Sequence, residues 1–180
     1  MDWQNKLPAG AKYPQHTLRT LSGEALTLGA PRGDADWQLV VIYRGRHCPL
    51  CTRYLNELEG FLPRLHALGI DVVAASGDSQ SQLEEHMSRL QVSFPLAYGL
   101  SVAQMRELGV YISIPRSEQE TDHEFAEPGL FVVNEHGTVQ VVDISNNPFV
   151  RPQLEALVSG LEWIRNPDNH YPIRGTFEGN

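Results

Sequence analysis

The sequence predicts an α/β fold, with a mixed central sheet, helices on both faces and an N-terminal β-hairpin extension. Three observations support this. Strand-like and helix-like hydrophobic spacings alternate along the 180 residues, a hairpin-like segment lies near each end, and no repeat, low-complexity tract or linker divides the chain. A chain of this length buries roughly 70% of its unfolded surface around one core. We therefore predict one domain over residues 1–180, in which residues 166–180 form a C-terminal tail.

The predicted strands are short apolar runs bounded by turn residues. Ser22-Gly23 suits a hairpin turn, because glycine adopts a positive φ without strain. The run from Trp37 to Tyr43 is almost continuously apolar, which is typical of a strand buried on both faces. Strands are expected over residues 16–21, 24–28, 37–43, 70–75, 94–98, 130–133 and 138–144.

The predicted helices are segments in which apolar residues recur every three or four positions. The longest covers residues 49–68 and contains Pro63, which should kink it or end its regular part. Ser81 and Glu84 form a capping-box pattern that opens the next helix. The remaining elements are a short helix over residues 102–108, a closing helix from Pro152 and a polar surface loop over residues 116–127.

Composition and charge exclude several classes of function. Acidic residues outnumber basic ones by 22 to 14, and the formal charge of −8 would repel nucleic acid. Residues 1–6 lack a signal-peptide pattern, and no segment approaches the roughly 20 apolar residues that span a bilayer. We therefore predict a cytoplasmic protein with no nucleic-acid or membrane partner. Acidic residues such as Glu120 are expected on solvated faces, as are six scattered histidines: His16, His66, His86, His123, His136 and His170.

The two cysteines, Cys48 and Cys51, are the first candidates for chemistry. Cys48 follows a predicted buried strand and opens the long helix, with Pro49 in the first helical position. Unpaired backbone N–H groups and the helix dipole favour an anion there, so the pKa of the Cys48 thiol should fall below its usual value of about 8.5. Three further candidates would add positive charge nearby: Arg44, Arg46 and His47.

Cys51 lies one helical turn after Cys48, so the pair is expected to cycle between dithiol and disulfide. Two alternatives remain open: a pair of inert buried thiols, and a zinc site that includes His47. The zinc site lacks a second Cys or His pair at ligand spacing, so no metal is predicted. No glycine-rich phosphate loop is present, so no bound nucleotide is implied, and no cofactor is predicted. The reducing power must therefore come from another protein or a small thiol.

The segment Tyr43-Arg44-Gly45-Arg46-His47-Cys48-Pro49-Leu50-Cys51 resembles the active-site segment of a known group. This is the alkyl hydroperoxide reductase and thiol-specific antioxidant (AhpC/TSA) group of thioredoxin-fold proteins, and within it the peroxiredoxin-like subgroup with a C-P-x-C motif. The resemblance covers roughly residues 15 to 165. It continues in residues 72–79, 94–96 and 128–137, which are similar to the later strands and turns of that group.

The resemblance implies a thioredoxin fold in which Cys48 attacks a hydroperoxide and Cys51 resolves the product to a disulfide. It also implies a thioredoxin- or glutathione-type electron donor and leaves a homodimer open, since family members often associate. Pro128 precedes a predicted strand, where thioredoxin-fold proteins carry a cis-proline that helps to bind an extended thiol substrate. An ordinary trans-proline at the start of a strand is the alternative.

The sequence departs from the peroxiredoxin pattern at four positions. Gly45 replaces a Thr or Ser, Val41 replaces a Pro, His47 replaces an aromatic residue, and Pro128 stands where an Arg is usual. The missing Thr or Ser and the presence of Pro128 favour an alternative function, a thioredoxin-like reductase or oxidase of protein disulfides. A third hypothesis is a binding module that uses the polar loop over residues 116–127. The missing Arg could be replaced by one of Arg44, Arg46, Arg116 and Arg151.

Overall fold

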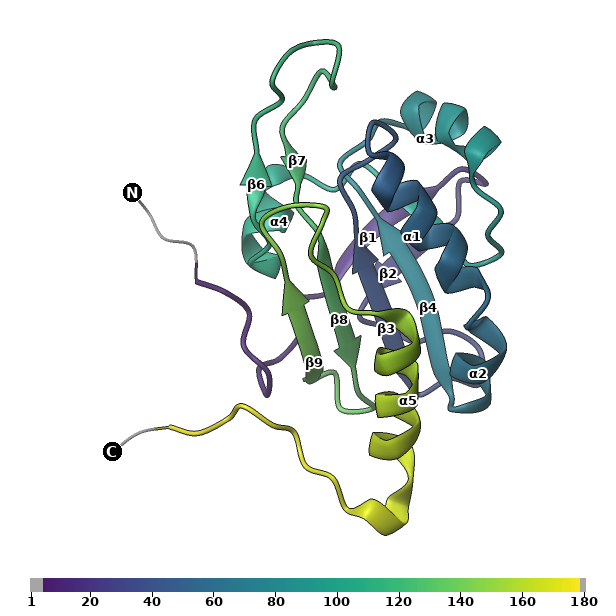
Figure 1. Ribbon diagram of the computed structural model, residues 1–180, viewed down its shortest axis with the longest axis vertical. Coiled ribbons are helices and arrows are strands. Elements are labelled where there is room, and N and C mark those ends of the chain that lie inside the picture. The colour runs from purple at the N-terminus through teal and green to yellow at the C-terminus, as the bar shows by residue number, and fades with distance from the viewer. Residues whose placement is uncertain (1–4, 179–180) are drawn as a thin grey trace.

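The computed structural model describes residues 5–178 and contains a seven-stranded mixed sheet in the order β2-β1-β5-β4-β3-β8-β9 (Figure 1). Most of residues 1–6, on which the expectation about a signal peptide rests, and the last two residues of the predicted tail lie outside this range. The strands of the sheet are β1 (His16–Thr20), β2 (Ala25–Leu28), β3 (Trp37–Ile42), β4 (Ile70–Ala75), β5 (Leu96–Tyr98), β8 (Gly129–Val133) and β9 (Val139–Ile144).

The pairing of the strands confirms the mixed sheet and its N-terminal hairpin. Strands β3, β4 and β5 run parallel, whereas β8 and β9 are antiparallel to their neighbours. The hairpin of β1 and β2 joins the sheet through β5 and turns at Gly23, whose φ is +85°. Every predicted strand is present, with its ends shifted by two residues at most.

The helices lie on both faces of this sheet, as predicted. They are α1 (Pro49–Glu59), α2 (Leu62–Ala67), α3 (Gln80–His86), α4 (Val102–Leu108) and α5 (Leu154–Arg165), with short 3₁₀ turns at Met87–Arg89 and Pro167–Asn169. Side chains of α1, α2, α3 and α5 pack in one core cluster, and those of α4 pack in another with the N-terminal hairpin. Figure 1 shows α1, α2 and α5 in front of the sheet and α4 behind it.

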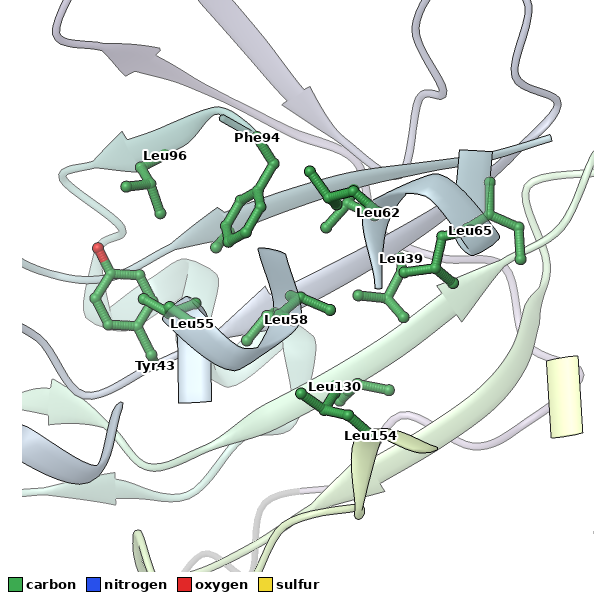
Figure 2. Close-up of a cluster of buried hydrophobic side chains, with 14 of the residues drawn as sticks. Leu39, Tyr43, Leu55, Leu58, Leu62, Leu65, Phe94, Leu96, Leu130 and Leu154 are labelled. Atoms are coloured by element: carbon green, nitrogen blue, oxygen red, sulfur yellow. The ribbon is translucent and has the colours of Figure 1, made fainter. Parts of the chain in front are cut away.

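Strand β3 lies between these two cores. Leu39 and Val41 belong to the cluster with α1, whereas Val40 and Ile42 belong to the cluster with α4. Because successive side chains of a strand point to opposite faces, a strand covered on both sides must be apolar at every position. Figure 2 shows Leu55 and Leu58 of α1 in the first cluster, where each contributes roughly 2 kcal/mol by burial.

Three predicted helix boundaries are wrong. The closing helix expected from Pro152 begins at Leu154. The expected helix over residues 49–68 is two helices, because α1 ends before Gly60 and Pro63 lies in the first turn of α2. A proline lacks the backbone N–H that a helix interior needs, but it fits the first turn. The capping box of α3 is formed by Ser79 and Gln82, two residues earlier than the expected pair.

The polar loop predicted over residues 116–127 is only in part a surface loop. It belongs to an arm, residues 112–126, whose base is a small sheet of β6 (Ile112–Ser113) and β7 (Phe125–Ala126). Residues 116–119 are exposed, but Phe125 and Glu127 are buried. The polar composition of the loop does not indicate this burial, because Glu127 is buried together with Arg44, an ion-pair partner from a distant segment.

Candidate active site

The cysteine pair lies where β3 ends and α1 begins. Cys48 is the N-cap of α1 with extended backbone dihedrals, and Pro49 occupies the first helical turn. The Sγ atom of Cys48 accepts a hydrogen bond from the backbone N–H of Cys51 at 3.2 Å. This N–H lies in the first turn of the helix and also donates to the carbonyl oxygen of Cys48 at 3.1 Å. The N–H groups of a first helical turn point toward the group that caps it. The sulfur therefore occupies the position that suits an anion.

Cys48 and Cys51 are joined by a disulfide, with their Cα atoms 5.3 Å apart. Cys48 is 1% exposed and Cys51 is fully buried, and both pack in the core cluster that contains Leu55 and Tyr43. One helical turn thus brings the two sulfurs together without any rearrangement of the fold.

The two arginines of the segment are held by carboxylates. The Nε atom of Arg44 lies 3.1 Å from the Glu127 carboxylate, and its Nη2 atom lies 3.6 Å from that of Glu120. The Glu120 side chain is largely buried, which corrects the expectation that it is solvated. Arg46 is 39% exposed and lies 3.4 Å from Glu85. These arginines add less positive charge around the sulfurs than the sequence predicts, because each has a counter-ion.

His47 packs edge-on against the ring of Phe125, with the ring centroids 4.5 Å apart. Neither ring nitrogen has a hydrogen-bond partner among the described residues. Burial, reinforced by the Arg44 charge, lowers the pKa of His47. A histidine with a lowered pKa is neutral at neutral pH. The expectation that His47 adds positive charge beside the cysteines is therefore wrong.

Gly45 leaves room for a buried carboxylate. Its φ is +139°, and a Cβ atom there would lie 2.5 Å from Oδ1 of Asp78. Asp78 is fully buried, and its Oδ2 atom accepts a hydrogen bond from the backbone N–H of Arg46 at 2.7 Å. The hydroxyl side chain that peroxiredoxins carry at this position has no space here, because the Asp78 carboxylate occupies it.

Two histidines that the sequence placed in solvent support this site. His123 of the arm has its Nε2 atom 3.3 Å from Asp78, and the hydrogen bond to that carboxylate raises the pKa of His123. His86 is fully buried, its Nε2 atom is 2.7 Å from the hydroxyl of Thr52, and burial lowers its pKa to about 4. Neither contact could be predicted from spacing in the sequence, because each histidine is far along the chain from the residue that it contacts.

Of the four candidate arginines, Arg151 is the one that reaches a sulfur. Its Nη2 atom donates a hydrogen bond to Sγ of Cys51 at 2.7 Å. Its guanidinium carbon lies 5.1 Å from the ring centroid of Tyr54, whose hydroxyl donates to the carbonyl oxygen of Pro152 at 2.8 Å. The loop between β9 and α5 therefore covers the first turn of α1, at the same end of the sheet as the arm (Figure 1).

Pro128 is not a cis-proline. All peptide bonds of the described residues are trans, so the alternative of an ordinary proline before a strand holds. Pro128 is buried, precedes β8, and its carbonyl oxygen accepts a hydrogen bond from the backbone N–H of Ser145 at 3.0 Å. Its neighbour Gly129 pairs with Ile42, near the end of the strand that leads to Cys48.

Residues 5–178 show neither a metal cluster nor a membrane-spanning helix. Within this range, no three or more His, Cys, Asp and Glu side chains are arranged to hold a metal ion. None of the helices in it combines the length and apolar character needed to cross a membrane.

Fold and site together define a thioredoxin-fold thiol oxidoreductase. The family model described as the AhpC/TSA family matches residues 9–142, and the chain belongs to this family. It is therefore a thiol-dependent peroxidase or thiol–disulfide oxidoreductase. No curated protein matches the sequence.

Solved structures with this fold include both kinds of enzyme. A peroxiredoxin-like protein from Aquifex aeolicus is 17% identical, with a TM-score of 0.69 and 89% of each chain covered. Peroxidoxin BcpB from Mycobacterium tuberculosis is 15% identical, with a TM-score of 0.71 over 89% of this chain and 99% of that one. A Chlorobium tepidum protein assigned as the thiol:disulfide interchange protein DsbE is 16% identical, with a TM-score of 0.67 and the same coverage. These similarities show the fold.

Proposed function

We propose that this protein reduces hydroperoxides, with Cys48 as the attacking thiolate and Cys51 as the resolving cysteine. The observation that carries the proposal is the position of Cys48. Its sulfur caps α1, accepts the Cys51 N–H, is joined to Cys51 and is 1% exposed. A sulfur enclosed in this way suits a small substrate better than a disulfide on the surface of another protein.

The reaction has three steps. The Cys48 thiolate attacks one peroxide oxygen, so that an S–O bond forms and the O–O bond breaks, and the leaving oxygen takes up a proton to give an alcohol or water. Cys51 then attacks the sulfenic sulfur, an S–S bond forms and the hydroxyl group leaves as water. A thioredoxin- or glutathione-type thiol finally reduces the disulfide and is itself oxidised.

The surrounding residues would support this chemistry without touching the substrate. Pro49 sets the φ angle of the first helical turn, which places the Cys48 sulfur over the helix start. Arg44 and Arg46 hold the preceding loop through their ion pairs, and His47 closes it as a neutral side chain. Pro128 begins β8, which pairs with β3 and so supports the strand that ends at the site.

One observation favours a second candidate, a reductase or oxidase of protein disulfides. Peroxiredoxins use a hydroxyl at the position of Gly45 to bind the peroxide, and here the Asp78 carboxylate fills that space. A thiol pair that lacks this hydroxyl can still exchange disulfides, because exchange needs only a thiolate and access to it.

Substitution of each cysteine separates the two candidates. With Cys51→Ser, one equivalent of peroxide should be consumed per chain, and Cys48 should become a sulfenic acid that a dimedone-type probe traps. Cys48→Ser should consume none, and serves as the matched control. If wild type and Cys51→Ser both leave peroxide and probe unreacted while wild type reduces insulin disulfides, the protein is a disulfide oxidoreductase.

A further inference from the structure

Arg151 is a half-buried cation that contacts the redox pair directly. Among residues 5–178, no carboxylate lies within ion-pair distance of its guanidinium. Its Nε and Nη1 atoms are enclosed and have no hydrogen-bond partner in this range. Its Nη2 atom is 2.7 Å from Sγ of Cys51. The sulfur of Cys51 is therefore the hydrogen-bond acceptor of the Arg151 guanidinium.

The charges that face Arg151 leave it under-compensated. Burial lowers the pKa of Arg151, as does the nearby Arg44, whereas Tyr54 and Glu127 act in the opposite direction. Glu127 is already paired with Arg44, and burial raises the pKa of Tyr54, which keeps its hydroxyl neutral. Removing a cation from water without a partner is costly. In the disulfide state the sulfur beside Arg151 carries no charge that could offset this cost.

Reduction changes the charge at that sulfur. When the S–S bond breaks, Cys51 can hold a full negative charge at hydrogen-bond distance from Nη2 of Arg151. A charge-assisted hydrogen bond is roughly twice as strong as a neutral one. The pairing would satisfy one enclosed cation and one enclosed anion together.

We propose that Arg151 is a positioning residue that keeps Cys51 as a thiolate in the reduced protein and so shifts the dithiol–disulfide equilibrium toward the dithiol. This rests on the proposed function only in requiring that the cysteine pair cycles. It gives the resolving cysteine a partner of its own, because Cys48 is held by the helix start and Cys51 by a residue from a distant loop. A resolving cysteine that is already ionised needs no base before it attacks.

The reduction balances as follows. A donor dithiol becomes a disulfide and gives up two electrons and two protons. The bond between Cys48 and Cys51 breaks and Cys51 stays ionised, so that Cys48 takes up at most one proton and the remainder is released to solvent. The protein therefore takes up at most one proton per two electrons at neutral pH, where two ordinary thiols would take up two.

Equilibration with reduced and oxidised glutathione tests the proposal on the whole chain. Arg151→Met should make the disulfide at least about tenfold harder to reduce, which corresponds to about 30 mV, because an adjacent opposite charge favours a thiolate by about tenfold or more. Arg151→Lys should recover part of this difference. Arg53→Met is the matched control. Arg53 is exposed on α1, the helix that carries Cys51, and its replacement should change the equilibrium less than twofold.

Three results would overturn the proposal. They are an Arg151→Met equilibrium within twofold of wild type, equal shifts for Arg151→Met and Arg151→Lys, and uptake of two protons on reduction of the wild-type protein. The last measurement needs no variant, so it can still overturn the proposal if Arg151→Met fails to fold.

Thiolate absorbance in Cys48→Ser, with and without Arg151→Met, distinguishes this proposal from the proposed function. The Cys51 thiol should ionise at lower pH when Arg151 is present, and equal titrations would contradict the role of Arg151. If the wild-type pair forms no disulfide at all, the proposed function fails, while this titration still reports on Arg151.

Discussion

The charged residues on the two sides of the disulfide differ in whether a counter-ion lies beside them. On the upstream side, which we define as residues 44–47 with Asp78 and His123, Arg44 and Arg46 pair with carboxylates and the Asp78 carboxylate faces His123. On the downstream side, which comprises Arg151 and Tyr54, the cation has a sulfur and an aromatic ring as its neighbours.

This difference indicates which charges can act on the chemistry. A buried charge with a counter-ion mainly fixes the geometry of its surroundings, because its field is largely cancelled. A buried charge without one responds to any change of charge nearby. The upstream side therefore shapes the loop that carries Cys48, whereas the downstream side senses the redox state of Cys51.

The largest expected effect is a pH-dependent loss of stability through His86, which supports the upstream side from α3. Its folded pKa is about 4 and its unfolded value is 6.5. The unfolded chain therefore binds the extra proton first as the pH falls. The contribution of neutral His86 to the free energy of unfolding is complete above pH 6.5. It is lost progressively as the pH falls to 4, which lowers the stability by about 3 kcal/mol. Urea unfolding of wild type and His86→Gln across this range should show a shallower dependence in the variant.

His123 provides a control of opposite sign. Its folded pKa is raised, so its contribution is complete below its unfolded value of 6.5 and is lost as the pH rises through the folded value. His123→Asn should therefore lower the stability most at acid pH and remove the decline on the neutral side, while the slope of the profile below pH 6.5 stays as in wild type. Parallel profiles for wild type and His86→Gln would contradict the assignment to His86.

The next effect concerns the packing of the upstream loop. Gly45→Ala should destabilise the protein by about 2 to 3 kcal/mol, because the new methyl group would press on Asp78 in addition to the backbone strain. Gly23→Ala is the control: it has a positive φ but open space around the position, so it should cost only about 1 kcal/mol. Equal thermal denaturation midpoints for the two variants would show that Asp78 yields to the methyl group.

The smallest effect tests the downstream side. Tyr54→Phe removes the hydrogen bond to Pro152 and keeps the ring beside Arg151, so it should cost about 1 kcal/mol of stability. The equilibrium with glutathione should stay within twofold of wild type. Tyr98→Phe, whose long hydrogen bond is exposed, should leave the stability unchanged. A large redox shift in Tyr54→Phe would mean that the hydroxyl, and not only Arg151, controls Cys51.

Local patterns were enough to predict every strand of the main sheet and the position of Cys48 at a helix start. Strand β3 is apolar because two cores cover it, and Ser22-Gly23 turns because glycine tolerates a positive φ. The division of the first long helix was harder to predict, since Pro63 permits either a kink or a new helix start.

The sequence by itself determined the fold class and the cysteine pair, because both depend on residues that are neighbours in the chain. Only the tertiary structure decided which charges surround the pair. It placed Asp78 against Gly45, buried His86 beneath α1, and brought Arg151 to Cys51 across 100 positions. The physical reason is that a side chain's charge acts through distance and burial, and both are set by how the elements pack.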